Sequence, residues 1–127
     1  MTAGERQVVR DYKDLQVWQK SMELARQIYG ATQTFPQEER FGLVAQMRRA
    51  AVSVPSNIAE GQARNTTGEF IQFISHAEGS LAELDTQLRL ACDLGYCKGA
   101  AVQEVFALIV EVQKMLKGLR KSLSSDH

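Results

Sequence analysis

Residues 102–123 read VQEVFALIVEVQKMLKGLRKSL, and the spacing of the apolar residues in this stretch decides the fold class. They recur at alternating steps of three and four: Val102, Val105, Ile109, Val112, Leu116, Leu119 and Leu123. Such spacing aligns one apolar seam along a helix, as in helical bundles and coiled coils. We therefore expect a helix that begins near Gly99 and packs against other helices.

The stretch before it has the same period and clear signals at both ends. Its apolar row is Phe70, Ile74, Ala77, Leu81, Leu84, Leu88 and Ala91. Thr66 and Glu69 have the spacing of a capping box at the start, and Gly95 is a natural stop. These signals predict a helix between Thr66 and Gly95.

The first helical stretch of the chain is less sharply bounded. Its apolar row is Leu15, Trp18, Met22, Ala25 and Tyr29. Asp14 is the expected N-cap, with Asp11 as an earlier alternative. Gly30 weakens the far end of this helix.

A proline lies inside the remaining helical stretch, which follows Thr34-Phe35-Pro36. The apolar row runs straight past this proline: Val44, Met47, Ala51, Val54 and Ile58. Because a chain that turned at Pro55 would lose this register, we predict one long helix over residues 37–63, kinked near Pro55. The carbonyl of Ala51 then loses its usual donor. Two helices that meet at Ser53–Pro55 are the alternative.

The four stretches together predict an all-α fold. No segment has sustained strand-type alternation, and the connections are only a few residues long. Short links make consecutive helices antiparallel, which gives an up-and-down antiparallel four-helix bundle. We expect the bundle over residues 14–123, a polar N-terminal tail over 1–13 and a frayed C-terminus over 124–127.

Three of the helices have more apolar residues than one seam needs. A second row contains Leu24, Ile28, Ala31, Phe73, Leu90, Leu94, Leu108 and Met115. These residues either widen the stripe that faces a thick core or form a subunit interface. We favour the interface.

The net charge and the lengths of the apolar runs bear on whether the chain binds nucleic acid or membranes. The chain has 15 basic and 15 acidic residues, so no net charge draws it to nucleic acid or anionic membrane. No apolar run approaches the ~20 residues of a spanning helix, and Met1–Arg10 lacks the apolar core of a secretory signal. We expect a cytoplasmic protein that does not bind membranes.

The sequence has no pattern typical of a catalytic, cofactor or metal site. Its two histidines, His76 and His127, lack the Glu-x-x-His spacing of di-iron bundles. Cys92 and Cys97 lack a second ligand cluster, so they are a poor zinc signal and do not make a disulfide framework. Gly-rich phosphate loops and serine–base arrangements are missing too. We therefore expect no catalytic residues, no cofactor and no metal.

One polar row on the second helix could form a partly buried hydrogen-bond network. Its members are Gln46, Arg49, Ser53, Asn57 and Glu60. We expect Ser53 to serve the carbonyl freed by Pro55 and Arg49 to pair with Glu78 or Glu83. Such networks usually fix register or partner choice, and a solvated face is the competing interpretation.

Basic residues gather at two places that could contact nucleic acid. The candidates are Arg48, Arg64, Lys114, Lys117, Arg120 and Lys121. Cations near a helix C-terminus also interact favourably with its dipole, which explains the last four without a ligand.

Several motifs resemble the family of four-helix bundle proteins encoded in intervening sequences of 23S ribosomal RNA. The stretches that carry the resemblance are Leu15-Gln-Val-Trp18-Gln, Phe35-Pro36, Gly42-Leu43, Gln46-Met-Arg-Arg-Ala50, Ser53-Val-Pro-Ser-Asn57-Ile-Ala-Glu60-Gly61 and Glu78-Gly-Ser-Leu81-Ala-Glu83-Leu. The resemblance implies a small bacterial protein, often a ring of five subunits, with no established catalytic residues. The chain also looks related to the accessory protein of diversity-generating retroelements, which binds nucleic acid but is strongly basic.

These observations lead to one expectation about function and one alternative. We expect a non-enzymatic homo-oligomer, a pentamer by the resemblance, that serves as a scaffold or accessory protein. The alternative is an accessory protein that binds RNA or DNA through basic faces of the oligomer.

Overall fold

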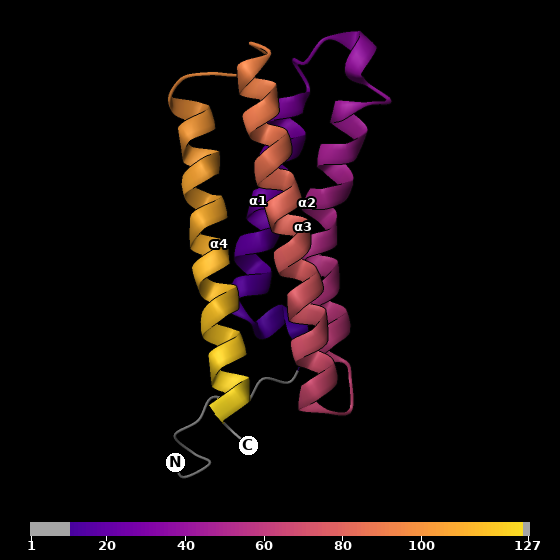
Figure 1. Ribbon diagram of the computed structural model, residues 1–127, viewed down its shortest axis with the longest axis vertical. Helices are drawn as coiled ribbons and strands as arrows, with labels where there is room; N and C mark the ends of the chain where they lie inside the picture. The colour runs from indigo at the N-terminus through magenta and orange to yellow at the C-terminus, as the bar shows by residue number, and fades with distance from the viewer. Residues whose placement is uncertain (1–10, 126–127) are drawn as a thin grey trace.

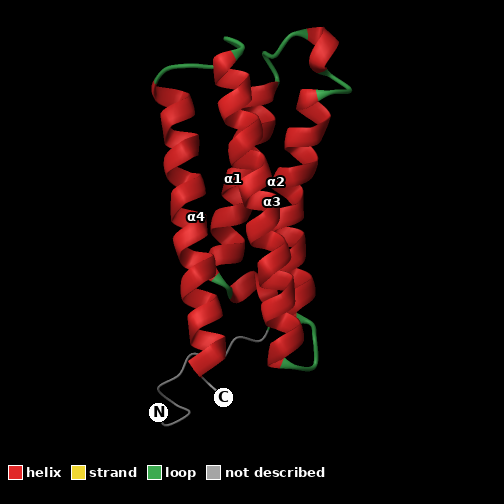
Figure 2. Cartoon of the chain, in the orientation of Figure 1, coloured by secondary structure: helices red, strands yellow, loops and turns green. Residues whose placement is uncertain are grey.

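Four helices run up and down along one axis in the computed structural model, which describes residues 11–125. They are α1 (Gln16–Thr32), α2 (Leu43–Gln62), α3 (Thr67–Asp93) and α4 (Ala100–Ser125), with short 3-10 helices η2 (Tyr12–Asp14) and η3 (Gln37–Glu39). Figure 2 shows only helices and connections over these residues. Helices α1 and α3 each pack against α2 and α4, so the four helices form a square. The predicted antiparallel four-helix bundle is confirmed.

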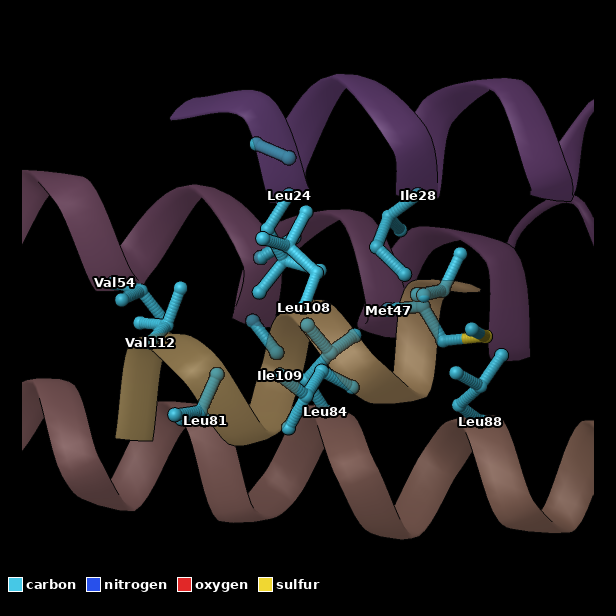
Figure 3. Close-up of a cluster of buried hydrophobic side chains, with 14 of the residues drawn as sticks. Leu24, Ile28, Met47, Val54, Leu81, Leu84, Leu88, Leu108, Ile109 and Val112 are labelled. Carbon is cyan, nitrogen blue, oxygen red and sulfur yellow. The ribbon is translucent and has the colours of Figure 1, made fainter. Parts of the chain in front are cut away.

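The core lies along the axis between the four helices. Figure 3 shows side chains from all four converging there. The fully buried members of this cluster include Leu24, Ile28, Met47, Val54, Leu81, Leu84, Leu88 and Val112. Burial of a leucine or isoleucine side chain contributes about 1.5–3 kcal/mol, so this shared cluster is what makes the helices one domain.

Helix α1 presents a different face to the core from the one that its apolar spacing suggested. Of the predicted row only Ala25 is buried, whereas Leu24 and Ile28 of the second row are fully buried. Ser21 also lies on the buried face, because its hydroxyl is satisfied by the carbonyl of Trp18 at 2.8 Å. Leu24 and Ile28 are therefore core residues, and the expectation that they form a subunit interface is wrong.

Helix α2 starts later than predicted. The chain makes the short helix η3 at Gln37–Glu39 and becomes α-helical only at Leu43, after Gly42 adopts φ −104° and ψ −107°. The side chain of Glu39 accepts a hydrogen bond from the Leu43 N–H at 3.2 Å, which satisfies one free donor at the new helix start. The predicted start at residue 37 is therefore wrong.

Helix α2 continues without interruption past Pro55, as predicted. Pro55 is buried inside the helix, which excludes two helices meeting at Ser53–Pro55. The kink near Pro55 stays a prediction, since a continuous helix can pass a proline with more or less bending. Ser53 does not serve the carbonyl of Ala51 as expected; its hydroxyl lies 2.8 Å from that of Ser80 on α3.

Both ends of α3 lie where the local signals placed them. The Thr66 hydroxyl accepts a hydrogen bond from the Glu69 N–H at 3.1 Å, which confirms the N-cap. At the other end Gly95 has φ +82°, and the Tyr96 N–H donates to the Ala91 carbonyl at 2.9 Å. This is the Schellman arrangement, in which a left-handed glycine lets the chain leave the helix.

The ends of the chain differ in part from the expected boundaries. Neither Asp14 nor Asp11 caps α1, whose N-cap is Leu15 without a side-chain hydrogen bond; Asp11 caps the short helix η2 instead. Helix α4 continues through Ser125, so Ser124 and Ser125 are helical where we expected fraying. The rest of the predicted N-terminal tail, residues 1–10, and the last two residues, 126–127, lie outside the described residues.

Candidate functional site

The middle of the polar row on α2 forms a small hydrogen-bond cluster with α3. The Asn57 side-chain amide donates to the Ser53 carbonyl at 2.8 Å and to the Ser53 hydroxyl at 3.0 Å. That hydroxyl is also within 2.8 Å of the Ser80 hydroxyl. All three residues are half-buried, so the cluster joins α2 and α3 at the edge of the core.

The outer members of the polar row do not join this cluster. Gln46, Arg49 and Glu60 are exposed, and Glu60 lies 3.9 Å from Arg64 in the next turn. Over residues 11–125, Arg49 makes no ion pair with either expected carboxylate. The structure instead pairs Glu78 with Arg120 of α4, while Glu83 lies 3.5 Å from the Gln87 side chain.

Rotation of α3 about its axis explains why the expected ion pair does not form. Ser80 is on the side of α3 that faces α2, whereas Glu78 is on the side that faces α4. Successive helical residues point about 100° apart, so residues two positions apart lie far round the helix from one another. Glu78 therefore pairs with the Arg120 guanidinium on α4 instead of with Arg49.

Three of the six candidate nucleic-acid contacts are already engaged within the chain. Arg48 donates to the Thr32 hydroxyl at 2.9 Å and stacks over the Tyr29 ring at 4.5 Å from its centroid. Arg64 lies over the Phe73 ring at 4.6 Å, and Arg120 binds Glu78 and the Ser75 hydroxyl. These guanidinium groups have intramolecular roles.

The other three candidates form one exposed row on α4. Lys114, Lys117 and Lys121 follow one another at steps of three and four, so they share a face of the helix. All three are exposed, and none makes an ion pair within the described part of the chain. Of the six candidates, these three are the ones that the described residues leave unpaired.

A groove with apolar walls runs between α1 and α2. Two adjoining clefts of about 660 and 550 Å³ share Tyr29 and Val52 along it. We call it the α1–α2 groove and define it by six residues: Trp18, Met22, Tyr29, Phe41, Val52 and Pro55. Phe41 is the most exposed large apolar side chain described, at 87%. The groove is thus a concave apolar surface that residues 11–125 leave uncovered.

The sequence pattern missed this groove because it assigned Trp18, Met22 and Tyr29 to the core. Since α1 turns Leu24 and Ile28 inward, Tyr29 is exposed, and Trp18 and Met22 are only half-buried. The exposure of Phe41 was not predicted, because the predicted helix over residues 37–63 included this residue. Gly42, directly after Phe41, is a helix-weakening residue and was the one local signal of the break.

A second exposed apolar surface lies on α3. Leu90 and Leu94 are 48% and 50% exposed and lie one turn apart, and we call them the α3 patch. Of the remaining predicted second row, Leu108 is buried and Ala31, Phe73 and Met115 are half-buried. The second row was therefore partly core and partly surface.

The end of the bundle near η3 is held by a tyrosine. The Tyr96 hydroxyl donates to the Glu39 carboxylate at 2.8 Å, and its ring packs on Phe35 with centroids 5.4 Å apart. The hydrogen bond to Glu39, followed by desolvation, raises the pKa of Tyr96 above its ordinary value of 10.0. This contact ties the α3–α4 turn to the start of α2.

Residues 11–125 contain neither a membrane-spanning helix nor a cluster of metal-binding side chains. Among residues 11–125 no helix has both the length and the apolar character to cross a bilayer. Over the same residues, no three side chains among His, Cys, Asp and Glu gather closely enough to hold a metal ion.

Comparison with known proteins identifies a structure with the same fold and the family of this chain. A crystal structure of a protein of unknown function from Bacteroides thetaiotaomicron, described as a member of the S23 ribosomal protein family, superposes with a TM-score of 0.76. The two are 24% identical, and the match covers 83% of this chain and 95% of that one, so it shows a common fold. No curated protein matches the chain. Because residues 13–118 match the family described as 23S rRNA-intervening sequence proteins, the chain belongs to that family.

Proposed function

We propose that this chain is a non-enzymatic, cytoplasmic scaffold or accessory protein that assembles with copies of itself into a closed ring. Five subunits is the number that the family resemblance implies. The observation that carries the proposal is the presence of two exposed apolar surfaces, the α1–α2 groove and the α3 patch, on different helices. Exposed apolar surfaces of this kind usually mark association.

Two unlike surfaces are what a ring needs. In a two-fold dimer one patch meets its own copy, whereas in a larger ring each copy uses one patch to bind a different patch on the next. The groove is concave and has aromatic side chains, and the α3 patch offers two leucines on a convex helix surface. Insertion of Leu90 and Leu94 into the groove of the next copy would bury both.

The charges beside the two surfaces are complementary. Arg40, Arg48 and Arg49 line the groove. Glu83 lies two turns before Leu90 on the same face of α3, and Asp93 lies next to Leu94. Opposite charges at the rim of an interface favour the correct register and speed association.

The mass of the assembly in solution tests the proposal. We expect light scattering at micromolar concentration to give five times the 14.2 kDa of the chain. Val52→Glu in the groove and Leu90→Glu in the α3 patch should each dissociate the ring, because each places a charge in the interface. Both side chains are exposed, so the monomer should still fold, as circular dichroism would show.

Val110→Glu on α4 is the matched control. Val110 is 45% exposed, between Val52 at 42% and Leu90 at 48%, but it belongs to neither surface. We expect this variant to keep the wild-type mass. A monomeric wild-type chain would refute assembly, and a ring that persists in both groove and patch variants would refute this choice of surfaces.

The second candidate function, binding of RNA or DNA, is favoured by the lysine row on α4. Lys114, Lys117 and Lys121 are exposed and unpaired over the described residues. A ring would repeat this row once per subunit, so a neutral chain would still have a continuous basic band. Phosphate contacts made by such a band would be strongly salt-dependent.

Titration with a structured RNA at low and moderate salt tests this second function. Replacing each lysine of the row by alanine should weaken binding and reduce the salt slope by about one per lysine. Lys98→Ala is the control, because Lys98 is an exposed lysine outside the row. No binding at low salt, or equal loss in the control, would rule out the lysine row as a nucleic-acid surface.

A further inference from the structure

The two cysteines of the chain lie side by side at the turn between α3 and α4. Cys92 is in the last turn of α3 and Cys97 follows the Gly95 cap, and their Sγ atoms are 3.6 Å apart. Both thiols are free and half-buried. The hydrogen bond from the Tyr96 N–H to the Ala91 carbonyl reverses the chain between them. The turn that ends α3 therefore brings the two thiols together.

A cleft gives small molecules access to Cys97, and the Cys92 sulfur lies 3.6 Å from the Cys97 sulfur. Cys97 lines a cleft of about 660 Å³ between α1 and the start of α4. Tyr96 and Lys98 line the same cleft, together with Gln27 and Thr34 from the side of α1. The residues that line this cleft are different from those that line the α1–α2 groove.

We propose that Cys92 and Cys97 form a reversible dithiol–disulfide site whose oxidant is a low-molecular-weight disulfide that enters through this cleft. The Cys92 thiolate attacks one sulfur of the small disulfide, and the first small thiol leaves with a proton. Cys97 then loses its proton and attacks the Cys92 sulfur, which releases the second small thiol. In total the two protein thiols lose two hydrogen atoms, and one small disulfide becomes two thiols.

The raised pKa of Cys97 favours this order of attack. Burial and the hydrogen bond with Cys92 raise the pKa of Cys97 to about 12, so Cys97 keeps its proton in neutral solution. The proposal therefore assigns the first attack to Cys92 and the second to Cys97. Once Cys92 is held in a mixed disulfide, its charge is gone, and one cause of the raised Cys97 pKa is removed for the second step.

The equilibrium between this chain and glutathione tests the proposal. The full chain is incubated in buffers of fixed oxidised-to-reduced glutathione ratio, quenched with acid, alkylated and weighed by mass spectrometry. We expect a product that has lost the mass of two hydrogen atoms and contains no added glutathione. Cys97→Ser should instead accumulate one glutathione on Cys92, because the second attack is impossible.

The same measurement on the urea-unfolded chain is the control for geometry. A disulfide between two cysteines five residues apart can also form in an unfolded chain. The proposal therefore requires that the disulfide form more favourably in the folded protein. We expect the equilibrium constant for closure to be at least about tenfold larger in the folded chain, since its sulfurs are already in contact. An equal or smaller constant on folding would overturn the proposal, and so would mixed disulfides or disulfide-linked dimers as the main wild-type products.

Discussion

Gly61 on α2 lies so close to Phe73 on α3 that a Cβ added to Gly61 would come within 2.9 Å of the Phe73 Cβ. The Phe70 ring would be nearer still, at 2.8 Å. Because the Phe73 Cβ is fixed to the backbone, it cannot give way as the end of a flexible side chain could. Glycine at position 61 is therefore what lets the two helices approach at this point.

Gly61→Ala should accordingly destabilise the bundle. Alanine favours a helix over glycine by about 0.5–1 kcal/mol, but overpacking a tight contact costs about 1–3 kcal/mol. We expect a net loss in the free energy of unfolding, measured by urea denaturation. Gly79→Ala within α3 is the control, because a Cβ there meets nothing within 4 Å. It should stabilise the protein, and a stabilising Gly61→Ala would contradict the close approach.

The rotation of α1 can be tested by truncating one residue from each of its two apolar rows. Leu24 is fully buried whereas Met22 is half-buried in the α1–α2 groove. Leu24→Ala should cost about 2–5 kcal/mol, as buried leucines do. Met22→Ala should cost clearly less in urea denaturation at the same protein concentration. The reverse order of the two costs would mean that the sequence-based seam is the true core face.

The hydroxyl pair between α2 and α3 predicts a measurable coupling. Ser53→Ala and Ser80→Ala each remove one side of the 2.8 Å contact. Ser53→Ala should cost more, because it also removes the acceptor of the Asn57 side-chain amide. A double-mutant cycle should give a coupling energy of about 0.5–1.5 kcal/mol between the two serines. Strict additivity would show that the contact contributes nothing.

Alkaline pH should destabilise the end of the bundle that contains Tyr96 and Cys97. The pKa of Cys97 is raised from 9.0 to about 12, and that of Tyr96 is raised above 10.0. A group with a higher pKa in the folded protein contributes stability below its unfolded pKa and loses it as the pH rises through the folded value. Under reducing conditions we therefore expect stability to fall between about pH 9 and pH 12.

Two variants separate the contributions of these groups to the alkaline decline. Cys97→Ser should remove the part that starts near pH 9, and Tyr96→Phe should remove the part above pH 10. Urea denaturation at several pH values gives the free energy of unfolding of each variant as a function of pH. A decline that is unchanged in both variants would show that other groups cause it.

Local signals in the sequence were sufficient to place both ends of α3, but they did not place the start of α2. The Thr66 cap and the Gly95 stop each depend on a few contiguous residues, so α3 begins and ends where they indicate. The apolar row of α2 correctly predicted a helix through Pro55. The start of α2 was missed because the charged side chain that caps it, Glu39, acts from outside the helix.

The sequence by itself determined that this protein has four helices, in which order they occur and that they pack antiparallel. Only the tertiary structure decided which row of α1 faces the core, that Glu78 pairs with Arg120, and that Cys92 and Cys97 lie in contact. The reason is physical: the period of a helix and its caps are set by neighbouring residues, whereas its rotation about its own axis is set by the helices against which it packs. That rotation leaves Tyr29 exposed and Trp18 half-buried along the groove on which the proposed assembly depends.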